Sequence, residues 1–158
     1  GNPMKPTIRT VLSATAISVI AAPTTVLALT TVVAVPAQAA PVSIPVSITA
    51  HTDFTFPASP FDSNLYGCAT GTVVNGAGKT QFTPWGGLFI GTKTFTCTGG
   101  NAGFDISLNA RFSGDGSTGT WVIADAWGDL AGMKGSGTLV GIPVGDTGID
   151  DKYSGTAR

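Results

Sequence analysis

The chain has 158 residues, a formal net charge of −1 and only 11% charged residues. This length suits a single domain, and the absence of a basic cluster excludes nucleic-acid binding driven by release of phosphate counterions. One histidine and two cysteines do not make a zinc ligand set. We therefore expect no metal, no other cofactor and no nucleic-acid partner.

The N-terminal segment is typical of a secretory signal peptide. Residues 1–3 precede the first methionine, and we interpret them as a cloning remnant. Lys5 and Arg9 provide the positive start, and a long apolar stretch follows. It ends in Ala37-Gln38-Ala39, which has the small residues that signal peptidase recognises.

We accordingly expect residues 4–39 to be a signal peptide that is removed. Residues 40–158 would then be the mature protein, secreted and free of the membrane. The alternative is that the apolar stretch is kept as a membrane anchor. Pro23 and the threonine content of the stretch argue against an anchor.

Two cysteines in an exported chain predict one disulfide, Cys68–Cys97. The two residues lie at similar distances from an intervening loop, so we expect them to face each other across an antiparallel strand pair. A bond closing a loop of this length contributes roughly 3–4 kcal/mol by restricting the unfolded chain. A free pair of reactive thiols is the alternative.

The rest of the chain predicts strands separated by turns. Glycine, threonine and serine are abundant, which favours strands over helices. Apolar and polar residues alternate in several segments, as expected for half-buried strands. We expect strands over residues 42–56, 68–74, 88–97, 104–112, 118–127, 135–144 and 152–157, and a loop over residues 57–64.

Seven or eight short strands without a convincing helix indicate an all-β barrel or sandwich. Glycines lie inside several of the expected strands, where they let a sheet bend sharply. These are Gly71, Gly91, Gly137 and Gly141. We therefore favour a small closed antiparallel β-barrel of about eight strands, with a β-sandwich as the alternative.

Three segments carry a resemblance to known proteins: residues 93–97 (Lys-Thr-Phe-Thr-Cys), 128–141 (Gly-Asp-Leu-Ala-Gly-Met-Lys-Gly-Ser-Gly-Thr-Leu-Val-Gly) and 151–155 (Asp-Lys-Tyr-Ser-Gly). The chain resembles a group of small secreted actinobacterial proteins, which are in turn similar to the allene oxide cyclase-like barrel shared with plant dirigent proteins. The resemblance covers roughly residues 68–158. It implies an eight-stranded barrel whose central cavity holds a reactive or apolar small molecule. It implies no catalytic residue, because none of those families' catalytic residues matches a position here.

Trp121, Asp125 and Trp127 share one face of an expected strand. If that face lines the barrel, Asp125 is a carboxylate in an aromatic cavity, where it acts as an acid or orients a ligand. If the other face points inward, Asp125 is exposed, and we favour this placement. Large aromatic side chains on an outer surface would then need a partner, of which an oligomer contact is one example.

Other chemistry-bearing residues are few. Trp85 lies in a Pro-Trp-Gly-Gly loop, where it is either a ligand contact or a cover over the barrel mouth. His51 falls on the polar side of the first strand, so we expect a surface histidine. Asp146, Asp150 and Asp151 suit a hard cation such as calcium by type, but they lack EF-hand spacing and turns alone explain them.

We expect a secreted, non-enzymatic barrel that binds a small apolar or aromatic molecule in or near its mouth. The candidate ligand contacts are Trp85, Trp121, Asp125 and Trp127. One alternative is a cyclase- or dirigent-type enzyme that steers closure of a bound substrate without metal or nucleophile; an exposed Asp125 would count against it. The other is a protein-interaction module, which a cavity-free barrel with an exposed Trp85 would favour.

Overall fold

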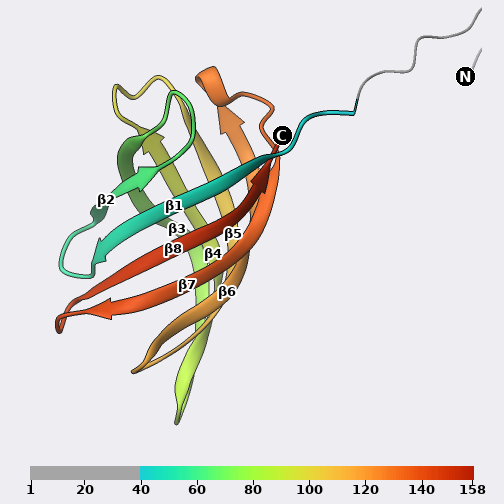
Figure 1. The fold of residues 1–158 in the computed structure, drawn as a ribbon. Coiled ribbons are helices and arrows are strands. Elements are labelled where there is room, and N and C mark those ends of the chain that lie inside the picture. Colours follow the sequence, from blue (N-terminus) through green and yellow to red (C-terminus); the bar gives the residue numbers. More distant parts are fainter. Residues whose placement is uncertain (1–39) are drawn as a thin grey trace, which may run out of the picture. The chain divides into compact units, whose positions relative to one another are not determined.

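The structure, a computed structural model, describes residues 40–158. They form one closed barrel in which each strand pairs antiparallel with its neighbours in sequence and the last strand pairs with the first (Figure 1). The prediction of an eight-stranded all-β barrel is therefore confirmed, and the sandwich alternative is wrong. The interpretations of residues 1–3 and 4–39 lie outside the described residues.

The strands cover most of the barrel domain, and a single short 3-10 helix joins the sixth strand to the seventh. The elements are β1 (Ile44–Asp53), β2 (Ala58–Ser63), β3 (Thr70–Thr83), β4 (Gly86–Cys97), β5 (Gly103–Ser113), β6 (Gly116–Trp127), η1 (Gly128–Leu130), β7 (Gly135–Val144) and β8 (Gly148–Ala157). From residue 40 to the C-terminus, no helix is long and apolar enough to cross a membrane.

The predicted alternation of β5 is confirmed. Phe104, Ile106, Leu108 and Ala110 are buried inside the barrel, while the residues between them are exposed or half-buried. Where no bulge interrupts it, the same period of two places alternate residues of the other strands in the interior, because successive side chains of a strand point to opposite faces. The core thus lies inside one continuous sheet.

The first predicted strand was too long. Phe54 and Phe56 continue its alternation in sequence, yet both are exposed, because β1 ends at Asp53. The Asp53 carboxylate accepts hydrogen bonds from the backbone N–H and the hydroxyl of Thr55, at 2.9 and 2.7 Å. This aspartate turn reverses the chain before the alternation can continue.

The predicted loop over residues 57–64 was also wrong, since it contains β2. This short strand pairs with β1 and with β3. Its proline and aspartate content is typical of a turn, but Phe61 points into the barrel and is fully buried. Burial of that ring outweighs the weak local preference of the segment.

The hairpin of β3 and β4 is longer than predicted. We expected this strand to end at Val74, before a glycine-rich stretch, but β3 continues to Thr83 and a two-residue turn, Pro84-Trp85, leads into β4. A register shift between Asn75 and Gly78 accommodates the extra residues as a bulge. The hairpin therefore projects beyond the neighbouring strands (Figure 1).

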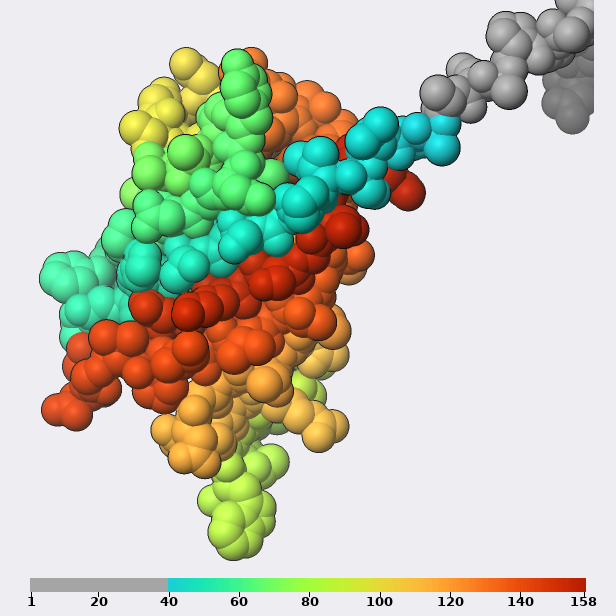
Figure 2. Space-filling model, viewed as in Figure 1, coloured from blue at the N-terminus to red at the C-terminus, as the bar shows by residue number. Residues whose placement is uncertain are grey.

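The two ends of the barrel differ. Since neighbouring strands are antiparallel, the turns at residues 54–57, 84–85, 114–115 and 145–147 lie at one end, which we call the mouth. The longer connections, residues 64–69, 98–102 and 128–134, lie at the other, which we call the closed end. The closed end is covered by apolar side chains from these connections: Leu65, Cys68, Ala102, Leu130 and Met133. In Figure 2, β1, β8 and β7 pack as adjacent bands, and the hairpin of β3 and β4 protrudes beyond them at the mouth.

An aromatic cluster fills the half of the barrel next to the closed end. We call it the aromatic plug, and it consists of Phe61, Phe95, Phe104, Trp121 and Tyr153. Phe95 is its centre, with ring centroids 5.1 Å from Phe61, 4.8 Å from Phe104 and 5.6 Å from Tyr153. Such edge-to-face and stacked pairs add to the energy of apolar burial.

Candidate functional site

The half of the barrel next to the mouth is hollow. It holds a cavity of about 570 Å³, a size typical of small-molecule sites. Its wall carries apolar side chains from four strands, including Phe89, Leu108, Ala110, Phe112, Leu139 and Ile149. Residues of the mouth turns, such as Gly114 and Asp146, also line it, so the cavity opens through the mouth.

An ion pair forms the deep end of this cavity. Lys93 on β4 and Asp151 on β8 meet with the Lys93 Nζ to Asp151 Oδ2 distance at 2.8 Å. In a closed ring of eight strands, β4 and β8 lie on opposite sides, so the pair crosses the barrel. We call it the cross-barrel pair.

The position of the pair follows from the strand period. Two residues further along β4 is Phe95, and two residues further along β8 is Tyr153, both in the aromatic plug. Two residues back along β8 is Ile149, which lines the cavity. The cross-barrel pair therefore lies between the plug and the hollow.

Both members of the pair are nearly removed from solvent. Lys93 is 7% exposed and Asp151 is 5% exposed. Desolvating two charges is expensive, and mutual attraction repays it only when the geometry is good, so a buried ion pair seldom adds net stability. Its presence in an apolar interior points to a role in the cavity rather than in folding.

A second ionisable group lies on the plug side of the pair. Burial raises the pKa of the Tyr153 hydroxyl well above its usual value of 10.0, and the negative charge of Asp151 raises it further. Among the described residues, the Tyr153 hydroxyl has no hydrogen-bond partner. Tyr153 is therefore a neutral phenol at neutral pH.

A small polar chamber of about 70 Å³ adjoins the cavity, and Lys93 and Asn75 line both spaces. We call it the polar annex. Thr52 and Ser59 also line it, and the Thr52 hydroxyl is buried without a hydrogen-bond partner in the part of the chain that the structure describes. A polar space of this size has room for ordered water.

The four ligand contacts predicted from the sequence lie apart from one another. Trp85 is 88% exposed at the tip of the hairpin of β3 and β4. Trp121 is buried in the plug, where its indole N–H donates to the Thr138 carbonyl at 3.0 Å. Trp127 packs over Gly103 near the closed end. None of these side chains lines the cavity, so their role as ligand contacts stays a prediction on which the site below does not depend.

Asp125 lies on the outside of the barrel for a reason that the sequence pattern does not reveal. Trp121 and Ile123 point inward, which by simple alternation would place Asp125 inside. A bulge intervenes, since Asp105 pairs with Asp125 while the next residue of β5, Ile106, pairs with Ile123. The extra residue reverses the alternation and turns Asp125 to solvent.

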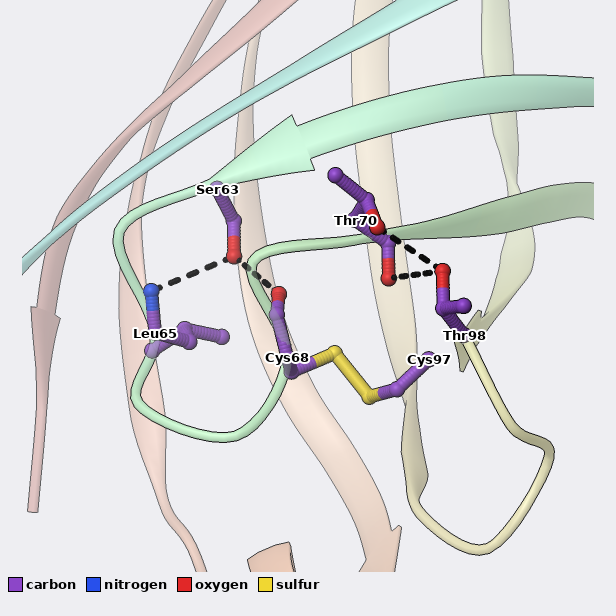
Figure 3. Close-up of a disulfide and its surroundings, with 6 residues drawn as sticks. All are labelled: Ser63, Leu65, Cys68, Thr70, Cys97 and Thr98. Carbon is purple, nitrogen blue, oxygen red and sulfur yellow. Dashed lines mark hydrogen bonds between the residues drawn. A yellow bond between two sulfur atoms is a disulfide. The ribbon is translucent and has the colours of Figure 1, made fainter.

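The predicted disulfide between Cys68 and Cys97 is confirmed (Figure 3). The two cysteines do not face each other across a strand pair, however. Cys97 is the last residue of β4 and pairs with Gly71, while Cys68 precedes β3 in the loop. The bond fastens that loop to the closed end.

Short hydrogen bonds hold the disulfide's surroundings in place. The Ser63 hydroxyl donates to the Cys68 carbonyl at 2.6 Å and accepts from the Leu65 N–H at 3.2 Å. Thr70 and Thr98 join through their hydroxyls at 2.8 Å on the other side (Figure 3). This end of the barrel is therefore fixed from several directions.

His51 lies on the outer surface between two carboxylates. Its Nδ1 is 2.9 Å from Asp150 Oδ1 and its Nε2 is 3.1 Å from Asp62 Oδ2. The hydrogen bond to Asp150, and to a smaller extent the one to Asp62, raises the pKa of His51 above its usual 6.5. Asp150 faces outward while its neighbour Asp151 faces inward, so these two do not share a cation site. Within residues 40–158, no three histidine, cysteine or acidic residues are placed to hold a metal ion.

Sequence reasoning missed Lys93 as a site residue and considered Asp151 only as a cation ligand. A signal existed: each is a charge in phase with an inward-facing aromatic residue two positions away, Phe95 or Tyr153. Asp151 instead suggested a turn, because Asp146, Gly148 and Asp150 precede it. Nothing local indicated that residues 58 positions apart in sequence would meet.

Comparisons with known proteins add no relative. The chain matches no protein-family model, no curated protein and no solved structure.

Proposed function

We propose that this protein is a secreted barrel that binds one small apolar or aromatic molecule in the cavity at its mouth. The observation that supports this most is the division of the barrel interior. One half is filled by the aromatic plug, and the other is an apolar-walled hollow of about 570 Å³ that opens between the mouth turns. A core formed only for stability packs without such a space.

The proposal of secretion rests on other features. The N-terminal residues have the pattern of a signal peptide, and the described domain contains a buried disulfide, which is typical of proteins from oxidising compartments. The proposal of a family relationship to the allene oxide cyclase-like and dirigent barrels rests on the sequence segments alone, and the barrel fold is compatible with it.

The two alternatives are less well supported. The enzyme hypothesis relied on Asp125 as a carboxylate inside the barrel, and Asp125 points to solvent. The interaction-module hypothesis called for a cavity-free barrel with an exposed Trp85; Trp85 is exposed, but the barrel is hollow. A binding protein accounts for both the hollow and its opening.

Filling the cavity tests the proposal. Ala110 and Asn109 are adjacent on β5, with Ala110 on the cavity wall and Asn109 on the outer surface. We expect Ala110→Phe to reduce binding of a neutral fluorescent apolar probe, N-phenyl-1-naphthylamine, at least tenfold, because the added ring occupies the space. Asn109→Phe adds the same ring outside and should leave binding unchanged.

Native mass spectrometry of the protein recovered from a secreting host gives an independent measurement. We expect an added mass that is lost on denaturation, together with the mass for cleavage after Ala39. If both variants are folded and Ala110→Phe binds the probe as tightly as Asn109→Phe does, that result would contradict a cavity site. Recovery of the uncleaved chain would contradict secretion, but it would have no bearing on the proposed ligand binding.

A further inference from the structure

We infer that the deep end of the cavity is a subsite for an uncharged, hydrogen-bonding head group, such as an alcohol or a carboxamide, on an apolar ligand body. This inference rests on the proposed binding function and names the chemical class of its ligand. The geometry that carries it is the cross-barrel pair: both residues line the cavity, and Lys93 also lines the polar annex.

The pair leaves both a donor and an acceptor for a ligand. The Lys93 ammonium has three N–H donors, and among the described residues its one hydrogen bond goes to Asp151 Oδ2. Asp151 Oδ1 has no hydrogen bond within the same residues. A hydroxyl or amide placed against the pair can donate to this carboxylate oxygen and accept from the ammonium at once.

Gly141 brings the Asp151 carboxylate close to a hydroxyl of the cavity wall. It lies on β7 directly beside Asp151, and a Cβ added there would be 2.7 Å from Asp151 Oδ1. The same added atom would collide with the hydroxyl oxygen of Ser117, a residue of the cavity wall. The missing side chain therefore lets two polar oxygens, one from Asp151 and one from Ser117, pack against the same point of β7 beside the cavity.

A third polar group borders the subsite from β1. The Thr52 hydroxyl is buried, lines the polar annex with Lys93, and has no partner among the described residues. A buried hydroxyl without a partner carries a desolvation penalty that a bound water or ligand atom would remove. The annex can thus hold water that extends the hydrogen-bond network of a head group.

Charge balance decides which head groups fit. Lys93 and Asp151 carry opposite charges, so the deep end of the cavity is neutral as a whole. An anionic head that approached Lys93 would also lie next to Asp151, and a cationic head that approached Asp151 would also lie next to Lys93. The repulsion between like charges is strong where solvent is excluded. A neutral head that both donates and accepts matches the pair without leaving a buried charge uncompensated.

Four probes with one aromatic body test this selectivity. They are 2-naphthalenemethanol, 2-naphthoate, (2-naphthyl)methylammonium and 2-methylnaphthalene, which differ only in the head group. By calorimetric titration at neutral pH we expect the alcohol to bind about tenfold more tightly than 2-methylnaphthalene, as for a hydrogen bond to a charged group. The two charged probes should bind more weakly than the alcohol.

Charge-switch variants test the residues. In Asp151→Asn the ammonium of Lys93 is left without its counter-charge, and preference should move to 2-naphthoate. In Lys93→Met the carboxylate is left alone, and preference should move to the ammonium probe. The double variant K93M/D151L removes both charges while keeping an apolar filling, so the alcohol should lose its advantage over 2-methylnaphthalene.

The double variant also covers the case in which a single variant fails to fold, which circular dichroism would show. Equal binding of all four probes to the wild-type protein would overturn the head-group inference and leave the proposed function intact. Tighter binding of 2-naphthoate or of the ammonium probe to the wild type would overturn it in favour of a charged ligand. Binding of none of the four would count against the proposed function itself.

Discussion

Lys93 and Asp151 bring two charges into a mainly apolar interior, and each charge is compensated by the other. Removing one partner leaves the other buried without compensation, which typically costs about 3–5 kcal/mol. Removing both leaves no such charge. The energetic signature of the pair is therefore non-additivity, because the two residues are in contact.

We expect Lys93→Met and Asp151→Asn each to lower the free energy of unfolding by about 3–5 kcal/mol. The double variant K93M/D151L should be much less destabilised than the sum of the two, and near the wild type. Guanidinium denaturation followed by circular dichroism measures all three. Additive losses would show that the pair acts as two independent residues.

His51 is the only histidine of the chain, so its titration can be followed alone. Its pKa is raised by the hydrogen bond to Asp150 and, to a smaller extent, by that to Asp62. A raised histidine pKa means that this contribution to stability is fully present below pH 6.5, the unfolded value, and is lost as the pH rises through the folded value. The side chain is 44% exposed, so salt screens the interaction.

The expected result for the His51 pair is a ranked effect. Asp150→Asn should lower the pKa of His51 more than Asp62→Asn does, as measured by proton NMR of the imidazole. The double variant should bring it nearest to 6.5. A histidine pKa that is unchanged in Asp150→Asn would mean that the outer-surface contacts do not form in solution.

At the scale of the element, the alternation of apolar and polar residues was sufficient to predict a strand and its buried face where no bulge or turn interrupts the strand. The segment 104–112 was predicted on the correct face, and the bounds of 135–144 agree with β7. Local turn chemistry misled at two places. Pro57 and Pro60 concealed β2, and the glycines after Asn75 concealed the second half of β3; both were decided by pairing with neighbouring strands rather than by propensity. At β1 the alternation misled instead, because an aspartate turn ends the strand.

The candidate site was less predictable than the strands. A bulge of one residue in β6 makes Asp125 face outward rather than inward. No residue type in this segment indicates the bulge. The aromatic residues that looked like ligand contacts instead divide between the plug, the closed end and a hairpin tip. The cavity depends on which strands lie opposite each other, which is a property of the closed ring.

Gly71 is required for packing between neighbouring strands. It pairs with Phe61, and a Cβ added at Gly71 would collide with the Thr96 carbonyl oxygen and lie 2.6 Å from the Phe61 ring. We expect Gly71→Ala to lower the free energy of unfolding by about 1–3 kcal/mol, since neither the strand carbonyl nor the ring in the filled plug can move away. Gly114→Ala is the control, because its Cβ would meet nothing within 4 Å. Thermal unfolding distinguishes them, and equal effects would refute the packing role.

For the whole molecule, the disulfide stabilises one end and the cavity occupies the other. The bond joins residues separated by 29 positions and lies at the closed end. Restricting the unfolded chain over this length contributes about 3–4 kcal/mol. The cavity lies on the far side of the aromatic plug, which separates its walls from the bond.

We therefore expect C68S/C97S to unfold at lower denaturant concentration, with a loss of about 3–4 kcal/mol. In the absence of denaturant it should still bind an apolar probe with nearly the wild-type affinity, because the mouth keeps its geometry. Denaturant titration and probe fluorescence on the same samples measure both. A large loss of probe affinity in the folded variant would show that the two ends are coupled.

The first strand of the barrel begins, and the last strand ends, at the closed end. Ile44 pairs with Ala157, and Arg158 exchanges backbone hydrogen bonds with Lys134 at the closed end. A fluorophore, a bead or a second protein attached after Arg158 is therefore held behind the barrel, with the entrance facing outward. The C-terminus is therefore a suitable attachment point. Protein immobilised on a surface through its C-terminus would present the cavity openings to the surrounding solution.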